Sequence, residues 1–309
     1  MRKVPALIAT AGLVLATLTA CSPGSAAADC TAPVRAGDAS DLVSVTGDLG
    51  SAPTVDFPTP LKTDTTQRSE IIAGDGPGLV QGQMVQVELS VYDASTGEPL
   101  QESAHDGTST QAYVVGADQM PASLTDGLLC AQVGSRVAVV SEAGTDAAES
   151  LVLVIDVVKG FLTRADGAAQ LPVAGLPAVV LAEDGTPGVT IGSAEPPTDL
   201  EVGVLKKGDG EKVADGSTAT IHYTGLLWKE NTVFESSWAN GSPIPILAAD
   251  GNTTEGGIIP GLAQALIGQT VGSQIIAVIP PELAYGDQAS EQIPADSTLV
   301  FVVDILGVD

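Results

Sequence analysis

The sequence is poor in basic, aromatic, histidine and cysteine residues, and each scarcity narrows the range of possible functions. Its 12 Lys and Arg residues are outnumbered by 38 Asp and Glu residues, and the resulting net charge of −26 would repel a nucleic-acid backbone. The two histidines are too few for a clustered metal site. The sequence also lacks the Gly-x-Ser-x-Gly turn of serine hydrolases. We therefore expect no nucleic-acid partner, no metal and no cofactor.

The N-terminal residues have the pattern of an export signal. Two basic residues precede an apolar run, residues 4–18, that is too short to span a bilayer comfortably. The run ends in LTAC, which matches the bacterial lipobox and would make Cys21 the lipidated new N-terminus. We predict a signal peptide over 1–20, a tether over 21–37, and a chain held outside the cytoplasm, on the bacterial cell membrane, by lipid alone. The alternative is an ordinary secretory signal that is cut nearby.

The other two cysteines form an even pair. If Cys21 carries lipid, Cys30 and Cys130 remain in an oxidising compartment, where disulfides form and persist. We predict a bridge between them, and the alternative is two buried free thiols.

An internal repeat organises the rest of the chain. Gly74-Asp75-Gly76 recurs as Gly208-Asp209-Gly210, an offset of 134 residues (208 − 74). The offset grows to 138 where Val133-Gly134 matches Val271-Gly272, and to 148 where the segments that begin at Leu151 and Leu299 match. The two copies therefore share one fold, and the second copy has gained two insertions.

Each copy is predicted to form strands around one short helix. Val85–Val91 and Thr218–Thr224 alternate between apolar and other residues, as half-buried strands do. In the second copy a helix is expected from Pro260, an early proline, to Gly268, a late glycine. The expected fold class is α+β, with two tandem domains, each an antiparallel sheet wrapped around one helix. Their boundaries are 38–160 and 176–309, with a linker over 161–175.

Five motifs in the second copy are specific when taken together. They are HYTG (222–225), FESS (234–237), IIPGL (258–262), PELAYG (281–286) and the run from IP to STLVF (293–301). In this order and at this spacing the second copy resembles the FKBP-type peptidyl-prolyl cis-trans isomerases over its whole length. Any one of the motifs alone would be weak.

The resemblance implies an isomerase of X-Pro peptide bonds. Rotation about such a bond is slow because the C–N bond has partial double-bond character. No bond needs to be cut, and a dry apolar pocket can favour the twisted amide over the planar forms. The implied partners are proline-containing, unfolded or exported polypeptides, and macrolide inhibitors are possible ligands. The alternative is a non-catalytic chaperone that keeps the fold and holds unfolded chains.

The resemblance also assigns site residues. The predicted catalytic residues are Tyr223, Phe234, Glu235, Tyr285 and Phe301. The predicted substrate-binding residues are Ile244, Ile258, Ile259, Leu262 and Ile293. Tyr285 and the backbone N–H of Ile259 would each hydrogen-bond a substrate carbonyl, and Glu235 would lie near the twisted one. The alternative for these residues is plain core packing.

Departures from the family pattern suggest a weakened site. Leu262 replaces the usual Trp of the pocket floor, Glu235 replaces Asp, and Ile244 replaces a common aromatic residue. We expect activity to persist at reduced strength, with weaker macrolide binding. His222 is expected to be a structural residue of a strand rather than a base.

The first copy departs further from the pattern. Leu89, Leu100 and Gln101 take the places of Tyr223, Phe234 and Glu235, and the tyrosine-bearing loop is missing. We expect this copy to be structural or peptide-holding rather than catalytic.

Overall fold

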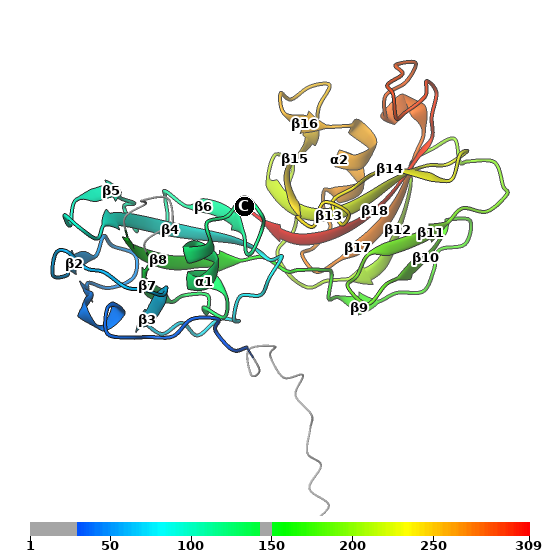
Figure 1. The fold of residues 1–309 in the computed structure, drawn as a ribbon. Coiled ribbons are helices and arrows are strands. Elements are labelled where there is room, and N and C mark those ends of the chain that lie inside the picture. Colours follow the sequence, from blue (N-terminus) through cyan, green and yellow to red (C-terminus); the bar gives the residue numbers. More distant parts are fainter. Residues whose placement is uncertain (1–29, 143–149) are drawn as a thin grey trace, which may run out of the picture.

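The structure is a computed structural model that describes residues 30–142 and 150–309. Two domains lie side by side, the first blue to green and the second green to red in Figure 1. The expected signal peptide, Cys21 and part of the tether lie outside the described residues. In the described part of the chain no helix is long and apolar enough to cross a membrane.

An antiparallel sheet forms the first domain, with the order β3-β7-β8-β4-β5 and with β6 also pairing with β4. The elements are β1 (Ser44–Thr46), β2 (Thr54–Asp56), β3 (Gln67–Ile72), β4 (Met84–Asp93), β5 (Pro99–Gln101), β6 (Gln111–Val114), α1 (Ala122–Leu128), β7 (Arg136–Val140) and β8 (Leu151–Gly160). Side chains alternate across the sheet. Val137 and Val139 of β7 belong to the core that includes α1, whereas Ala138 and Val140 pack with the β1–β2 hairpin.

The second domain repeats this arrangement, with the order β16-β15-β13-β18-β17-β12-β9 and with β14 on β13. The elements are β9 (Ala168–Ala169), β10 (Ala178–Leu181), β11 (Pro187–Thr190), β12 (Glu201–Lys207), β13 (Thr218–Leu227), β14 (Thr232–Ser236), β15 (Ile244–Asp250), β16 (Gly257–Ile258), α2 (Pro260–Leu266), β17 (Gln274–Ile279) and β18 (Leu299–Val308). Only the pair β15–β16 is parallel among the strand pairs of the described chain. The helix α2 covers one face of the sheet.

The internal repeat is confirmed as a structural repeat at all three offsets. Matching elements begin at Met84 and Thr218, at Ala122 and Pro260, and at Leu151 and Leu299. Even the irregularities correspond, because β4 has a bulge between Gln86 and Val87 and β13 has one between Thr220 and Ile221. The α+β fold class with two tandem domains is therefore confirmed.

A layer that the sequence did not predict covers the back of each sheet. The hairpin β10–β11 packs Val179 and Val189 on Trp228, Ile276 and other residues of the second sheet. The hairpin β1–β2 packs in the same way on the first sheet. Each domain therefore has three layers, a hairpin, a sheet and a helix.

The segment expected as a linker is packed rather than free. Phe161 is 2% exposed and Ala165 is 1% exposed. The amide of Ala165 donates to Asp304 Oδ2 at 2.7 Å, and β9 adds a strand to the edge of the second sheet at β12. Small residues at 165–169 let the chain lie flat against the sheet edge. The part of this segment from Phe161 to Ala169 thus packs against the second domain and extends its sheet.

The C-terminal end of β18 joins the two domains. Figure 1 shows it reaching toward β6 of the first domain, and Lys159 Nζ contacts Asp309 Oδ1 at 2.6 Å. The ring of Phe161 lies on the backbone of Gly307, where any side chain would collide with it. Met84, Phe161 and Leu306 form a small buried core between the domains. We call this contact the interdomain joint.

Cys30 and Cys130 are bonded to each other, with their Cα atoms 5.6 Å apart. The bridge links the start of the described chain to the end of α1, across a sequence separation of 100 residues. It therefore joins the segment expected as a tether, 21–37, to the first domain.

Candidate active site

An apolar cluster lies between the second sheet and α2. Tyr223 of β13, Phe301 of β18 and Leu262 of α2 are buried members of this cluster. The partly buried residues packed against it include Phe234, Ile244, Ile258, Ile259 and Ile293. The structure therefore brings together eight of the ten predicted catalytic and binding residues from five strands and loops around one helix.

The aromatic rings pack at defined angles. The ring centroids of Phe234 and Phe301 are 5.7 Å apart with an interplanar angle of 84°, and those of Tyr223 and Phe301 are 6.2 Å apart. Edge-to-face contacts of this kind are a favoured aromatic geometry. Gly225 makes it possible, because a side-chain carbon at that position would lie 2.6 Å from the Phe234 ring. The glycine of HYTG thus leaves room for the phenylalanine of FESS.

The two remaining site residues, Glu235 and Tyr285, form a polar edge together with the hydroxyl of Tyr223. Burial and a hydrogen bond with Glu235 raise the pKa of Tyr223 well above its ordinary value. Burial and the charge of Glu235 also raise the pKa of Tyr285, a residue that is 45% exposed. Both phenols therefore keep their protons at neutral pH. Tyr285, on the exposed edge, can donate a hydrogen bond to a ligand carbonyl.

The loop from β17 to β18, residues 280–298, carries Tyr285 and Ile293 and rises beside β14 in Figure 1. Backbone hydrogen bonds hold it in shape, from the amide of Gly286 to the carbonyl of Pro281 and from the amide of Asp296 to the carbonyl of Gly286. The loop is therefore folded on itself, which fixes the position of Tyr285.

A small polar network lies directly under the site and was not predicted. Ser237 Oγ accepts a hydrogen bond from the Tyr223 amide at 2.8 Å and contacts His222 Nδ1 at 2.8 Å. The imidazole of His222 stacks on Trp238, with centroids 4.0 Å apart. Burial lowers the pKa of His222 to about 4, so it is neutral at physiological pH. In the sequence, only Ser237, the second serine of FESS, could have pointed to this network.

The first domain has a different surface at the equivalent positions. Leu89 and Leu153 are buried where the second domain has Tyr223 and Phe301, and Leu100 is 61% exposed where it has Phe234. The connection from β7 to β8 covers only 141–150, and most of it lies outside the described residues.

The first domain also contains a Ser–His–Asp arrangement that sequence reasoning missed. His105 Nε2 contacts Ser90 Oγ at 2.9 Å, and His105 Nδ1 contacts Asp156 Oδ2 at 2.9 Å. His105 is 0% exposed and Ser90 is 2% exposed, so no substrate can reach the hydroxyl. Arg136 pairs with the same aspartate at 2.6 Å. The group is a buried structural network.

An aromatic-walled site with a phenol donor at its edge can hold an apolar ring and hydrogen-bond the peptide carbonyls beside it. The residues at this site therefore offer an apolar wall and a hydrogen-bond donor side by side.

Comparison with known proteins gives the family. The sequence model of FKBP-type peptidyl-prolyl cis-trans isomerases matches residues 209–306. The chain is 41% identical over 115 residues to "FK506-binding protein 2" of Yarrowia lipolytica, covering 36% of this chain and 76% of that protein. It is 33% identical over 124 residues to "FK506-binding protein" of Streptomyces anulatus, covering 40% and 96%. "Peptidyl-prolyl cis-trans isomerase FPR2" of Saccharomyces cerevisiae is 36% identical over 116 residues, covering 36% and 82%. The chain belongs to the FKBP-type peptidyl-prolyl cis-trans isomerase family, and it is an isomerase.

Proposed function

We propose that the second domain isomerises X-Pro bonds of exported or cell-envelope polypeptides in the aromatic cluster around Phe301. The observation that supports this most directly is the assembly of Tyr223, Phe234 and Phe301 in one apolar cluster with Tyr285 at its edge. Two of the similar proteins are named as FK506-binding proteins, so we extend macrolide binding to this site as part of the proposal.

The cluster favours the twisted amide by removing water from it. Resonance polarises the planar amide and also gives its C–N bond the partial double-bond character that creates a barrier of about 18–20 kcal/mol. Twisting the bond lowers the charge separation, so an apolar wall stabilises the twisted form relative to the planar forms. In the proposal the proline ring lies among Phe234, Phe301 and Tyr223, above Leu262.

Hydrogen bonds hold the neighbouring substrate carbonyls. Tyr285 donates to one carbonyl, and the amide of Ile259 donates to another. Glu235 lies near the twisted carbonyl, at the edge of the site beside Tyr223 and Tyr285. Ile244 and Ile293 complete the rim. Because Leu262 is smaller than Trp, the floor leaves more space, and we expect a weaker grip on the proline ring.

The proposal extends to location. The LTAC sequence supports lipidation of Cys21 and attachment to the outer face of the bacterial membrane. Mass spectrometry of the membrane-bound protein should find acyl groups on Cys21, and Cys21→Ala should release the chain. A released wild-type chain without lipid would contradict this part alone.

The isomerase proposal is tested with a short X-Pro peptide and the chain from residue 22 onward. The double variant Phe234→Ala/Tyr285→Phe should lose about 100-fold in kcat/KM, because a loss of about 2.7 kcal/mol of transition-state stabilisation has that effect. The matched control is Leu100→Ala/Tyr113→Phe in the first domain, which should keep full activity. Equal rates in the two variants would place catalysis elsewhere. If the wild type does not accelerate isomerisation, the non-catalytic chaperone is favoured.

A further inference from the structure

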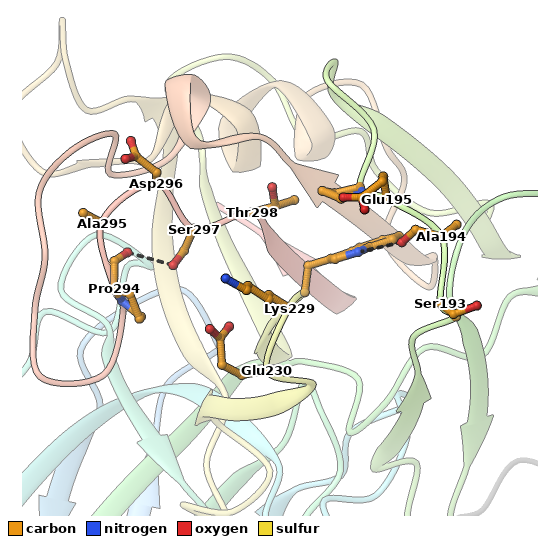
Figure 2. Close-up of a pocket in the computed structure, with 13 residues that line it drawn as sticks. Ser193, Ala194, Glu195, Lys229, Glu230, Pro294, Ala295, Asp296, Ser297 and Thr298 are labelled. Carbon is orange, nitrogen blue, oxygen red and sulfur yellow. Dashed lines mark hydrogen bonds between the residues drawn. The ribbon is translucent and has the colours of Figure 1, made fainter.

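A cavity lies beside the active-site loop, outside the apolar cluster of the site. It has a volume of about 620 Å³ and opens between three segments, shown in Figure 2. Residues 192–196 follow the β10–β11 hairpin and form one wall. Residues 294–298, the end of the loop from β17 to β18, form the opposite wall. Trp228, Lys229 and Glu230, at the end of β13, lie between the two walls.

The walls of this cavity are held in place by hydrogen bonds. Trp228 Nε1 donates to the carbonyl of Ala194 at 3.4 Å, and the amide of Trp228 donates to the carbonyl of Thr298 at 3.0 Å. Ser297 Oγ donates to the carbonyl of Pro294 at 2.7 Å. Trp228 itself is 8% exposed. The cavity is therefore formed before any ligand arrives.

The chemistry of the lining favours polypeptide. Glu195, Glu230 and Asp296 outnumber Lys229, and none of the four takes part in the ion pairs found among the described residues. An excess of carboxylates disfavours phosphate and nucleic acid and favours a basic ligand. The backbone amides of Ser193 and Glu195 make no hydrogen bond within the described chain. A polypeptide can offer a carbonyl to each of these amides, as well as basic side chains to the carboxylates.

The cavity and the active site share one loop. Ile293 packs against the apolar cluster of the site, and the next residue, Pro294, lines the cavity. A polypeptide whose proline lies in the site and whose chain passes over Ile293 therefore reaches the cavity directly. A short peptide that ends near the proline does not reach it.

We propose that this cavity is an accessory subsite that binds a basic stretch of the same polypeptide whose proline occupies the active site. The inference rests on the proposed function. If the cavity binds substrate in this way, affinity depends on the length and charge of the polypeptide as well as on the residue beside proline.

The test compares two substrates. One is a tetrapeptide with a central proline, and the other is a peptide of about 15 residues, about 50 Å when extended, with lysines on both sides of the proline. The cavity variant is Glu195→Lys/Glu230→Lys. The control is Glu98→Lys/Asp118→Lys, which makes the same change in net charge on exposed residues of the first domain.

The cavity variant should raise KM for the long peptide by about three- to tenfold at low salt, because it replaces two carboxylates that would pair with the lysines of the peptide. Its kcat/KM for the tetrapeptide should equal that of the wild type. Equal KM values for the long peptide in the cavity and control variants would overturn the subsite. Absence of isomerisation of either peptide by the wild type would instead overturn the proposed function.

Fluorescence gives a second measurement that does not depend on turnover. The chain has two tryptophans, so Trp238→Phe leaves Trp228 as the only reporter. Its emission should change on addition of the long peptide and remain constant with the tetrapeptide. A constant signal with both peptides, at concentrations that saturate isomerisation, would contradict binding in the cavity.

Discussion

Each domain has an aspartate at the same position of the equivalent strand, and the pKa values of the two aspartates are shifted in opposite directions. Asp156 of β8 and Asp304 of β18 are both almost fully buried. Burial alone would raise the pKa of Asp156, but the hydrogen bonds and charges of Arg136 and His105 lower it below its ordinary value. Burial raises the pKa of Asp304, even though the amide of Ala165 and the side chain of Gln274 donate to it.

The neighbours of each aspartate account for the difference. In the register of the sheets, Asp156 lies between Glu88 and Arg136, whereas Asp304 lies between His222 and Gln274. A depressed pKa contributes stability that is lost as the pH falls through the folded value, whereas a raised pKa contributes stability that is lost as the pH rises through it. At this position the first domain thus has a buried ion pair between Asp156 and Arg136, whereas in the second domain an amide and a glutamine side chain donate hydrogen bonds to Asp304.

Removing the buried cation should produce the largest effect. Arg136→Ala leaves Asp156 buried with one partner fewer and removes the donors to the carbonyls of Gly47 and Ser51. We expect the free energy of unfolding of the first domain to fall by about 3–5 kcal/mol. The equivalent change in the second domain, Gln274→Ala, removes a single side-chain donor and should cost about 1–3 kcal/mol. Hydrogen exchange resolved by strand measures both, and equal costs would remove the distinction between the domains.

Acid should weaken the second domain through His222. Its pKa is about 4 in the folded chain against an ordinary 6.5, so its contribution is complete above pH 6.5 and is lost as the pH falls toward 4. The loss should approach about 3 kcal/mol. Both tryptophans lie in the second domain, so their fluorescence during urea unfolding reports on it. His222→Gln should unfold with a smaller loss between pH 6.5 and 4, and the same loss as the wild type would show that His222 is not responsible.

Moving the domain boundary should have a smaller effect. A fragment 176–309 lacks the amide of Ala165 that donates to Asp304, and a fragment 161–309 keeps it. We expect the shorter fragment to be less stable by about 1–2 kcal/mol, because it loses a buried hydrogen bond to Asp304. A third fragment that begins at residue 168 keeps β9 and separates its contribution from that of Ala165. Equal urea midpoints for all three would restore the original boundary at 176.

The last prediction is that aromatic residues placed in the first domain give it no isomerase activity. Restoring aromatic residues in the first domain with Leu89→Tyr/Leu100→Phe should give no isomerase activity, because that domain lacks the loop that carries Tyr285. The measurement uses a chain whose own site is disabled by Phe234→Ala/Tyr285→Phe. Recovered turnover would mean that the rings alone are sufficient and that the loop is dispensable.

The sequence predicted much of this fold because both copies obey the same periodicity. The repeat located β4 and β13, both helices, and the strands β8 and β18, since insertions between them only shift the offset. All the predicted site residues except Ile244 lie in ordered motifs whose spacing is tied to the sheet, and this is what made them predictable. The order of the motifs also made Tyr285 predictable as a site residue, although it lies in a loop, where no periodic pattern of apolar residues marks it.

The rest depended on packing that a linear pattern does not contain. The hairpins β1–β2 and β10–β11 cover the backs of the sheets. The alternating residue pattern of a strand does not identify the element that packs behind the sheet. The segment 161–175 looked like a linker because small residues suit both loops and flat edge strands. Ser237 and Trp238 depend on the fold to meet His222, and the opposite pKa shifts of Asp156 and Asp304 depend on partners brought in from other strands.

The interdomain joint has a consequence for how such a chain can change over generations. Phe161 rests on Gly307, and Lys159 holds Asp309, so the end of the central strand of the isomerase domain is supported by its neighbour. Deletion of the first domain would expose Phe161 and Leu306, which are buried together with Met84 at the joint. A change that removes the first domain would therefore also remove part of the support of the second.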